Sequence, residues 1–173
     1  MPNVIHCIED DFKIFLDKSY YISRSPTQCG HSRYGRIMFN HHNPLDNEQE
    51  YDYYKRCVHR FKHLLQNTEH KLFIVIYVNQ SGDNTQQQIK NVIDFNNQFS
   101  NHSDPNYTLL VIFHIPNKVK CSHQFTYENN IHFLILHTLS SSTGTRFINH
   151  TDNEYLNRII KEKYNFQDFI NNS

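Results

Sequence analysis

Apolar side chains recur every three or four residues in four stretches of the chain, the spacing of amphipathic helices. The first stretch covers residues 3–18, and the second runs from about 48 to 66. The other two are marked by their apolar residues: Ile89, Val92, Ile93 and Phe99 in one, and Tyr155, Leu156, Ile159 and Ile160 in the other. The pattern therefore predicts four helices.

Three further stretches are continuous apolar runs rich in β-branched residues: Lys71–Val78, Thr108–Ile115 and Ile131–Thr138. Such runs are typical of strands covered on both faces. The helix predicted between the first two makes them a right-handed βαβ unit with parallel strands. We expect one α/β domain over residues 1–173, with three layers and a mainly parallel sheet flanked by helices.

The remaining segments carry weaker signals. Residues 23–35 are rich in turn formers and predict a loop, which is followed by a short strand ending at His41 and His42. Residues 116–130 are too short and polar to predict a crossover helix, so one edge pair of the sheet could be antiparallel. The loop SSSTGT follows the third apolar run, at the strand end where α/β sheets bind ligands, but no GKS signature accompanies it.

Charge and composition exclude several classes of partner. Lys+Arg and Asp+Glu balance at 17 each, so no basic field predicts nucleic acid as a partner. The longest apolar run is too short to span a bilayer, and no basic-then-apolar leader opens the chain. We therefore expect neither nucleic acid nor a membrane as a partner, and a cytoplasmic location.

Amino-acid usage is skewed, because alanine and tryptophan are absent and only four glycines occur. An AT-rich genome produces this skew, since the scarce residues need G/C-rich codons. We hypothesise an origin in a large DNA virus or an AT-rich protist, and a viral protein would act in the host cytoplasm. The nucleotide composition of the gene tests this hypothesis.

Histidines and cysteines raise the question of a metal or thiol site. His59 and His63 lie one step off the apolar stripe of their helix, where solvent is expected, so we expect no metal and no other cofactor. The four cysteines lack a CxxC motif, which indicates reduced thiols. Cys29, in a loop beside His31, is the best local candidate for a nucleophile, because a cysteine enzyme needs an imidazole near its thiolate.

Arg56 and Arg60 are one helical turn apart and would form a shared cationic edge. Such a pair can bind a carboxylate or a phosphate bidentately. The alternative is ion pairing with Glu48, Glu50 or Asp52 along the same helix.

A strand ending in F-x-H, the pattern Y-x-R-x-x-x-R-F-x-x-L-L and a buried strand follow one another in this chain. The residues are Phe39-Asn40-His41, then Tyr54, Arg56, Arg60, Phe61, Leu64 and Leu65, before KLFIVIYV. This order resembles a family of papain-like cysteine peptidases found in bacteria and large DNA viruses, and DFKIFLDKSYY is similar to the family's preceding segment. The resemblance covers roughly residues 8–80.

The resemblance implies a thiol hydrolase in which His41 is the base. The aspartate that follows this histidine in the family is His42 here, and no residue matches the family's nucleophile, whose N-terminal segment is missing. Loss of the nucleophile removes most of the rate enhancement. We therefore predict a divergent or truncated relative that does not catalyse and binds a protein or glycan ligand near His41, Arg56 and Arg60. The alternative is an active cysteine hydrolase or transferase using Cys29 with His41.

Overall fold

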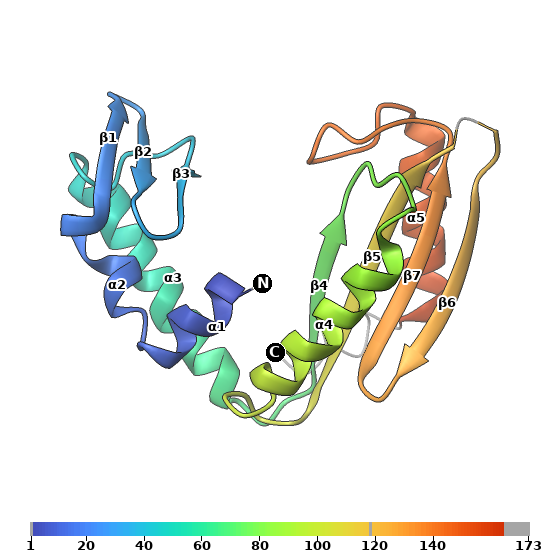
Figure 1. The fold of residues 1–173 in the computed structure, drawn as a ribbon, viewed down its shortest axis with the longest axis horizontal. Coiled ribbons are helices and arrows are strands. Elements are labelled where there is room, and N and C mark those ends of the chain that lie inside the picture. Colours follow the sequence, from blue (N-terminus) through green and yellow to red (C-terminus); the bar gives the residue numbers. More distant parts are fainter. Residues whose placement is uncertain (1, 118, 165–173) are drawn as a thin grey trace. The chain divides into compact units, whose positions relative to one another are not determined.

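The computed structural model describes residues 2–117 and 119–164, and the chain divides into two compact units (Figure 1). Unit 1 comprises Met1–Glu69 and Val92–Pro105, and unit 2 comprises His70–Asn91 and Asn106–Ser173. Each unit has its own sheet and its own hydrophobic core. The expectation of one domain over the whole chain stays a prediction.

The N-terminal part of unit 1 forms two short helices where the pattern predicts one helix over residues 3–18. Its elements are α1 (Pro2–Glu9), α2 (Lys13–Leu16) and the 3₁₀ turn η1 (Lys18–Tyr20). Asp11 and Phe12 have φ angles of 58° and 59°, left-handed values that interrupt an α-helix. The helix restarts with support from Asp10, whose carboxylate accepts the backbone N–H of Ile14 at 2.9 Å.

An antiparallel sheet in the order β1-β2-β3 occupies the region where the sequence predicts a loop over residues 23–35. Its strands are β1 (Tyr21–Ser25), β2 (Gln28–His31) and β3 (Gly35–Phe39). The loop prediction is wrong, whereas the short strand expected before the histidine pair is confirmed as β3. Gly30 allows β2 and β3 to approach closely, since a Cβ there would lie 2.6 Å from the carbonyl oxygen of Arg36.

The helix predicted from about 48 to 66 is confirmed as α3 (Glu48–Gln66). Asn47 caps its start, because the Asn47 side chain accepts from the backbone N–H groups of Gln49 and Glu50. The apolar stripe of α3 contributes to the core of unit 1, which consists of Tyr21, Cys29 and Phe39 with Phe15, Leu45, Tyr51 and Tyr54 around them.

The sheet of unit 2 has four strands in the order β4-β5-β7-β6. They are β4 (Lys71–Tyr77), β5 (Tyr107–Pro116), β6 (Ser122–Glu128) and β7 (Ile131–Thr138). β5 is parallel to both β4 and β7, whereas β6 pairs antiparallel with β7. The predicted βαβ unit is thus confirmed, with α4 (Thr85–Phe99) connecting β4 to β5.

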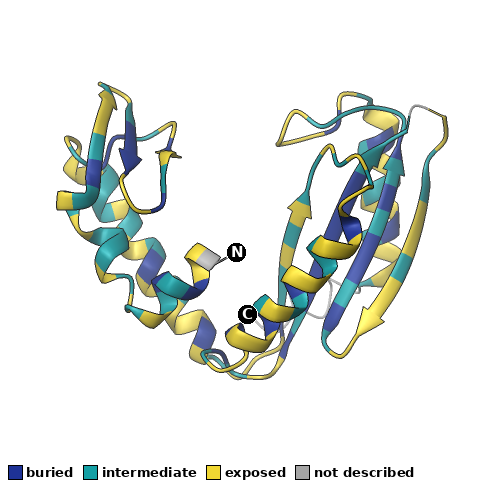
Figure 2. Ribbon diagram, viewed as in Figure 1, coloured by how far each residue is buried: buried dark blue, intermediate teal, exposed yellow. Residues whose placement is uncertain are grey.

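The core of unit 2 lies between one face of this sheet and α5 (His150–Lys163). It consists of Leu110, Ile112, Leu134, Leu136, Phe147 and Ile159. Figure 2 shows the central strands β5 and β7 largely buried, with more exposure on the edge strands β4 and β6.

The predicted fold class, a three-layer α/β domain with a mainly parallel sheet, is wrong. The protein is mixed α/β, with a three-stranded antiparallel sheet and a mixed four-stranded sheet. The strands that the sequence did not reveal, β1, β2 and β6, are short or expose mostly polar side chains, so they lack the apolar run that marks a buried strand. None of the helices in the described ranges combines the length and apolarity needed to cross a membrane.

Candidate functional site

The four residues predicted to form a site, Cys29, His41, Arg56 and Arg60, all lie in unit 1. Cys29 is on β2 and is completely buried. Its thiol donates to the carbonyl oxygen of Gly30 at 3.2 Å. Burial raises the pKa of the Cys29 thiol, so this group is protonated at neutral pH and is a poor nucleophile.

His41 lies in the turn after β3 and is exposed to solvent. No hydrogen bond joins its ring to Cys29 in the part of the chain that the structure describes. The neighbouring ring of His42 is better held, because its Nδ1 lies 3.4 Å from Glu50 Oε1 and it stacks on Tyr53 at a centroid distance of 6.2 Å. Within the ranges that the structure describes, no carboxylate pairs with His41, whereas the Glu50 carboxylate from α3 lies beside the ring of His42.

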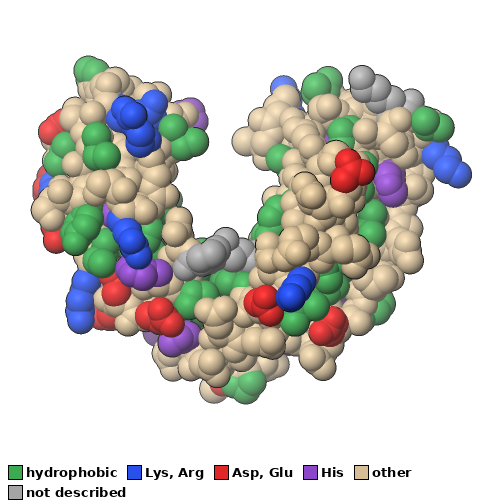
Figure 3. Space-filling view, in the orientation of Figure 1, with side chains coloured by type: hydrophobic (Ala, Val, Ile, Leu, Met, Phe, Trp, Pro, Cys, Tyr) green, Lys and Arg blue, Asp and Glu red, His purple; other side chains and the backbone are tan. Residues whose placement is uncertain are grey.

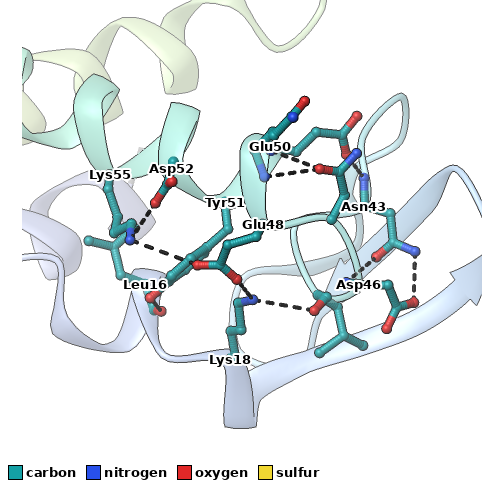
Figure 4. A network of polar contacts seen from close by, with 12 residues as sticks. Leu16, Lys18, Asn43, Asp46, Glu48, Glu50, Tyr51, Asp52 and Lys55 are labelled. Atoms are coloured by element: carbon teal, nitrogen blue, oxygen red, sulfur yellow. Dashed lines mark hydrogen bonds and ion pairs between the residues drawn. The ribbon is translucent and has the colours of Figure 1, made fainter.

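The first turns of α3 carry a polar network that uses the acidic residues of the helix (Figure 4). Glu48 pairs with Lys18 at 2.8 Å, and Asp52 pairs with Lys55 at 2.5 Å. Glu50 accepts from the backbone N–H of Asn43 in addition to its contact with His42. These bonds tie the start of α3 to η1 and to the loop after β3.

Asn43 holds that loop in place from a buried position, with 2% of its surface exposed. Its side-chain amide donates to the carbonyl oxygens of Ser25 and Pro26 at 3.2 and 3.3 Å. It also donates to the Asp46 carboxylate at 2.9 Å, a bond that Figure 4 shows. Sequence reasoning missed this residue, although an Asn-Pro dipeptide before an acidic helix start is a turn signal.

Glu48, Glu50 and Asp52 form their ion pairs with Lys18, His42 and Lys55 and not with Arg56 or Arg60. The pKa of Asp52 is lowered chiefly by its hydrogen bond to Lys55, and the nearby charge of Arg56 contributes. The side chains of Arg56 and Arg60 are exposed. The Arg60 guanidinium donates to Cys57 Sγ at 3.3 Å. Both arginines are thus cations available to an external anion.

Other side chains share this exposed side of α3. We define the α3 arginine face as Tyr53, Arg56, Cys57, Arg60 and Leu64, which follow one another at steps of three, one, three and four. That spacing places all of them on one side of a helix. Tyr53 is 45% exposed and Leu64 is 39% exposed, so the arginines are flanked by accessible apolar surface.

A second polar cluster, which the sequence did not reveal, lies at the carboxyl ends of β5 and β7 in unit 2. His114 and Thr138 are fully buried there. His114 Nδ1 accepts the backbone N–H of Asn79 at 3.1 Å, which leaves the ring proton on Nε2, 2.6 Å from Thr138 Oγ1. Thr138 Oγ1 then donates to the carbonyl of Ser140 at 2.7 Å. Burial lowers the pKa of His114, so its ring is neutral and every polar atom has a partner.

Asp152, in the first turn of α5, holds the loop after β7 from a fully buried position. It accepts the N–H of Leu139 at 3.0 Å, and the N–H and Oγ–H of Ser140 at 2.8 and 2.6 Å. The thiol of Cys121 donates to it at 3.2 Å. Burial alone would raise the pKa of Asp152, but these hydrogen bonds lower it below its usual range. The Asp152 carboxylate is a structural anchor whose two oxygens accept four hydrogen bonds.

The loop SSSTGT, which the sequence predicts to be an ordinary polar loop at a strand end, is held by hydrogen bonds to Asn79. Ser142 and Asn79 exchange two hydrogen bonds, of 2.7 and 2.9 Å. A single antiparallel bridge joins Ser142 in this loop to Phe147.

The described residues contain no group of three or more His, Cys, Asp or Glu side chains arranged to hold a metal ion. His59 and His63 are exposed on α3, as their place off the apolar stripe predicts. On the face drawn in Figure 3, Lys and Arg side chains occur in small separate groups among acidic and neutral ones. This face shows no broad positive field. The pair Arg56 and Arg60 is therefore the cationic feature that we consider as a candidate site.

In comparisons with protein-family models, curated proteins and solved structures, none matched this chain. The resemblance to papain-like cysteine peptidases thus stays a prediction. The candidate site is defined by geometry alone.

Proposed function

We propose that this protein acts by binding and not by thiol catalysis, and that the α3 arginine face takes an anionic group of a protein or glycan ligand. The observation that carries the proposal is the exposure of Arg56 and Arg60 while the acids of the same helix are engaged elsewhere. An exposed guanidinium that is in no ion pair can offer its donors to a ligand, although Arg60 uses one of its five on Cys57 Sγ.

The chemistry of the face narrows the ligand class. Two guanidinium groups one turn apart can bind a carboxylate, sulfate or phosphate through paired hydrogen bonds. Tyr53 and Leu64 add apolar contact on either side of the charges. Arginine beside an accessible aromatic ring is the combination that dominates many binding surfaces. We expect an acidic peptide or an acidic glycan in preference to a neutral one.

The state of Cys29 supports binding over the alternative of an active cysteine hydrolase or transferase. A thiol nucleophile must ionise and reach its substrate. Cys29 is fully buried, and burial raises its pKa. His41 is exposed and forms no described hydrogen bond with it. An active enzyme of this kind would need both residues rearranged.

The ligand test compares immobilised sialylated, sulfated and neutral glycans together with acidic and neutral peptides, with the purified full chain as the analyte. We expect binding to acidic members, and we expect Arg56→Glu and Arg60→Glu each to weaken it by at least about tenfold, the effect of losing one charge-assisted contact. Lys90→Glu, a charge reversal at an exposed position of α4, is the matched control and should leave binding unchanged. Equal binding by all variants, or no acidic preference, would refute the proposal.

The catalytic alternative is tested by alkylation of the native protein with iodoacetamide, followed by mass spectrometry of each cysteine. We expect Cys29 to react far more slowly than Cys57, which is half-buried. His41→Ala should not change this order. Selective fast labelling of Cys29 that His41→Ala abolishes would instead establish a live nucleophile.

A further inference from the structure

A small cavity of about 220 Å³ lies beside the first two turns of α3. Its lining consists of Gln49, Glu50 and Tyr53 from α3 and His42 from the loop after β3. All four residues belong to unit 1. The cavity is smaller than the roughly 300–1,000 Å³ of sites for drug-sized molecules, so it suits a single ring and not a long chain.

The cavity and the α3 arginine face share Tyr53, so they form one continuous surface. Gln49, Tyr53, Arg56 and Arg60 follow one another at steps of four, three and four, which places them in one row along α3. At a rise of about 1.5 Å per residue, Arg56 lies about 5 Å along the helix axis from Tyr53 and about 10 Å from Gln49. A ring bound in the cavity therefore has the guanidinium of Arg56 within reach of a substituent.

Tyr53 gives the cavity a flat apolar wall that its neighbours hold in place. The Tyr53 ring stacks on His42 at a centroid distance of 6.2 Å and an interplanar angle of 23°, and it meets Tyr54 edge-on at 5.5 Å. The Tyr53 hydroxyl forms a hydrogen bond with Cys57, which raises the pKa of Tyr53. An aromatic ring that is held and still accessible can pack against the apolar C–H face of a sugar ring.

The other lining residues supply acceptors and donors for hydroxyl groups. Glu50 Oε1 lies 3.4 Å from His42 Nδ1, and Glu50 Oε2 accepts the backbone N–H of Asn43 (Figure 4). A carboxylate can accept about four hydrogen bonds, so Glu50 can accept further ones from a ligand. The Gln49 amide can both donate and accept. The hydroxyls of a sugar also do both, so a carboxylate beside an amide is complementary to them.

The charge of Glu50 restricts where a ligand can be negative. The cavity end of the surface carries this carboxylate, whereas the other end carries Arg56 and Arg60. An anionic group is therefore favoured at the arginines, and neutral hydrogen-bond donors are favoured at Glu50. An acidic sugar has this distribution, because its ring carries one carboxylate or sulfate among neutral hydroxyls. A peptide rich in Asp and Glu would bring a second anion near Glu50, where like charges repel.

We propose that this cavity is the sugar-ring subsite of the α3 arginine face, and that the ligand is an acidic pyranose unit of a glycan. The inference rests on the proposed function, because Arg56 and Arg60 supply the contact with the anion. The sugar ring packs on Tyr53, and its hydroxyls bond to Gln49 and Glu50. Its carboxylate or sulfate lies against the two guanidinium groups.

The test is a titration of the purified full chain, followed by NMR of its backbone amides, with probes of similar size. Methyl β-glucuronide carries both the hydroxyl-bearing ring and a carboxylate. Methyl β-glucoside lacks the carboxylate, and cyclohexanecarboxylate lacks the hydroxyls. A ligand of this size should bind with a Kd of about millimolar order. We expect the glucuronide to bind at least about fivefold more tightly than either of the other two, since each of them lacks one set of hydrogen bonds.

Variants separate the two sets of contacts. Gln49→Ala, at an exposed position of α3, should weaken binding of the glucuronide at least about threefold and leave binding of cyclohexanecarboxylate unchanged. Arg56→Glu should weaken binding of both anions. Gln87→Ala, at an exposed position of α4, is the matched control and should change neither. Circular dichroism checks that all variants fold.

The outcomes distinguish this inference from the proposed function. Equal affinity for the glucuronide and cyclohexanecarboxylate, or glucuronide binding that resists Gln49→Ala, overturns the sugar-ring subsite while the anion site of the proposed function stands. Tighter binding of an end-blocked Gly-Asp-Gly peptide than of the glucuronide assigns the surface to acidic peptides and overturns the subsite as well. If neither anion binds, or if the glucoside binds as tightly as the glucuronide, both proposals are wrong.

Discussion

Replacing Asp152 by alanine should strongly destabilise unit 2, because this buried carboxylate is the common acceptor for the loop after β7. Its removal leaves four donors without their partner: the N–H of Leu139, the N–H and O–H of Ser140, and the thiol of Cys121. The side chain is fully buried, so solvent cannot simply take its place.

The magnitude follows from the number and kind of bonds lost. A buried donor left unpaired costs about 1–3 kcal/mol, while a thiol is a weak donor and adds little. Relaxation of the loop relieves part of the penalty. We expect a loss of about 3–5 kcal/mol, the size seen when one partner of a buried charged network is removed. A typical domain has only about 5–15 kcal/mol of stability in total.

Urea denaturation followed by circular dichroism measures this loss. Glu154→Ala is the matched control, since Glu154 lies on the same helix with a side chain that is 66% exposed, and it should cost less than about 0.5 kcal/mol. Asp152→Asn keeps the shape of the side chain but turns an amide N–H toward existing donors. Its loss of stability should therefore lie between those of Glu154→Ala and Asp152→Ala. An Asp152→Ala loss no larger than that of Glu154→Ala would refute the reasoning.

The pH dependence of stability should also depend on the Asp152 carboxylate. The pKa of Asp152 is lower in the folded state than in the unfolded chain, where it is about 3.8. The unfolded state therefore binds the proton first as pH falls, and the stabilisation present above that pH is lost as pH falls through the folded pKa. The stability of the Asp152→Asn variant should accordingly depend less on pH in the range below about 5. If the stability of the unmodified protein and that of the Asp152→Asn variant change with pH in the same way, the reasoning is contradicted.

Three further predictions concern other buried groups. Burial lowers the pKa values of His31 and His114, so the unfolded chain binds protons more readily than the folded protein. The urea midpoint of unfolding should therefore fall as pH drops below about 6.5. A midpoint that stays constant between pH 7.5 and 5 would argue against neutral buried rings. Gly30→Ala places a Cβ against the backbone of β3 and should cost about 1–3 kcal/mol in urea denaturation, and a neutral effect would show that the strands can separate freely. Asn43→Ala removes the side-chain amide contacts to Ser25, Pro26 and Asp46 and should clearly lower the melting temperature. Asn40→Ala, at an exposed position, is the control and should not lower it. Equal melting temperatures for the two variants would exclude an anchoring role for Asn43.

The part of the candidate site that sequence could supply is the spacing of Arg56 and Arg60. Their position on one side of α3 follows from helix periodicity, which is a local property. Whether they are available to a ligand depended on the partners of Glu48, Glu50 and Asp52, and those partners include Lys18 and His42 from outside the helix. The burial of Cys29 likewise arose from strand pairing that its short, polar neighbourhood did not reveal.

By itself, the sequence determined the elements whose signal is local and repeated. The periods of α3 and α5 and the apolar runs of β4, β5 and β7 identify them, because burial of a whole face requires the same kind of side chain at regular steps. Tertiary structure alone decided what depends on a distant partner: the antiparallel sheet of unit 1 and the anchoring of Asp152. The physical reason is that one residue's hydrogen-bond partner or cover comes from a segment many residues away, and no short window of sequence contains both.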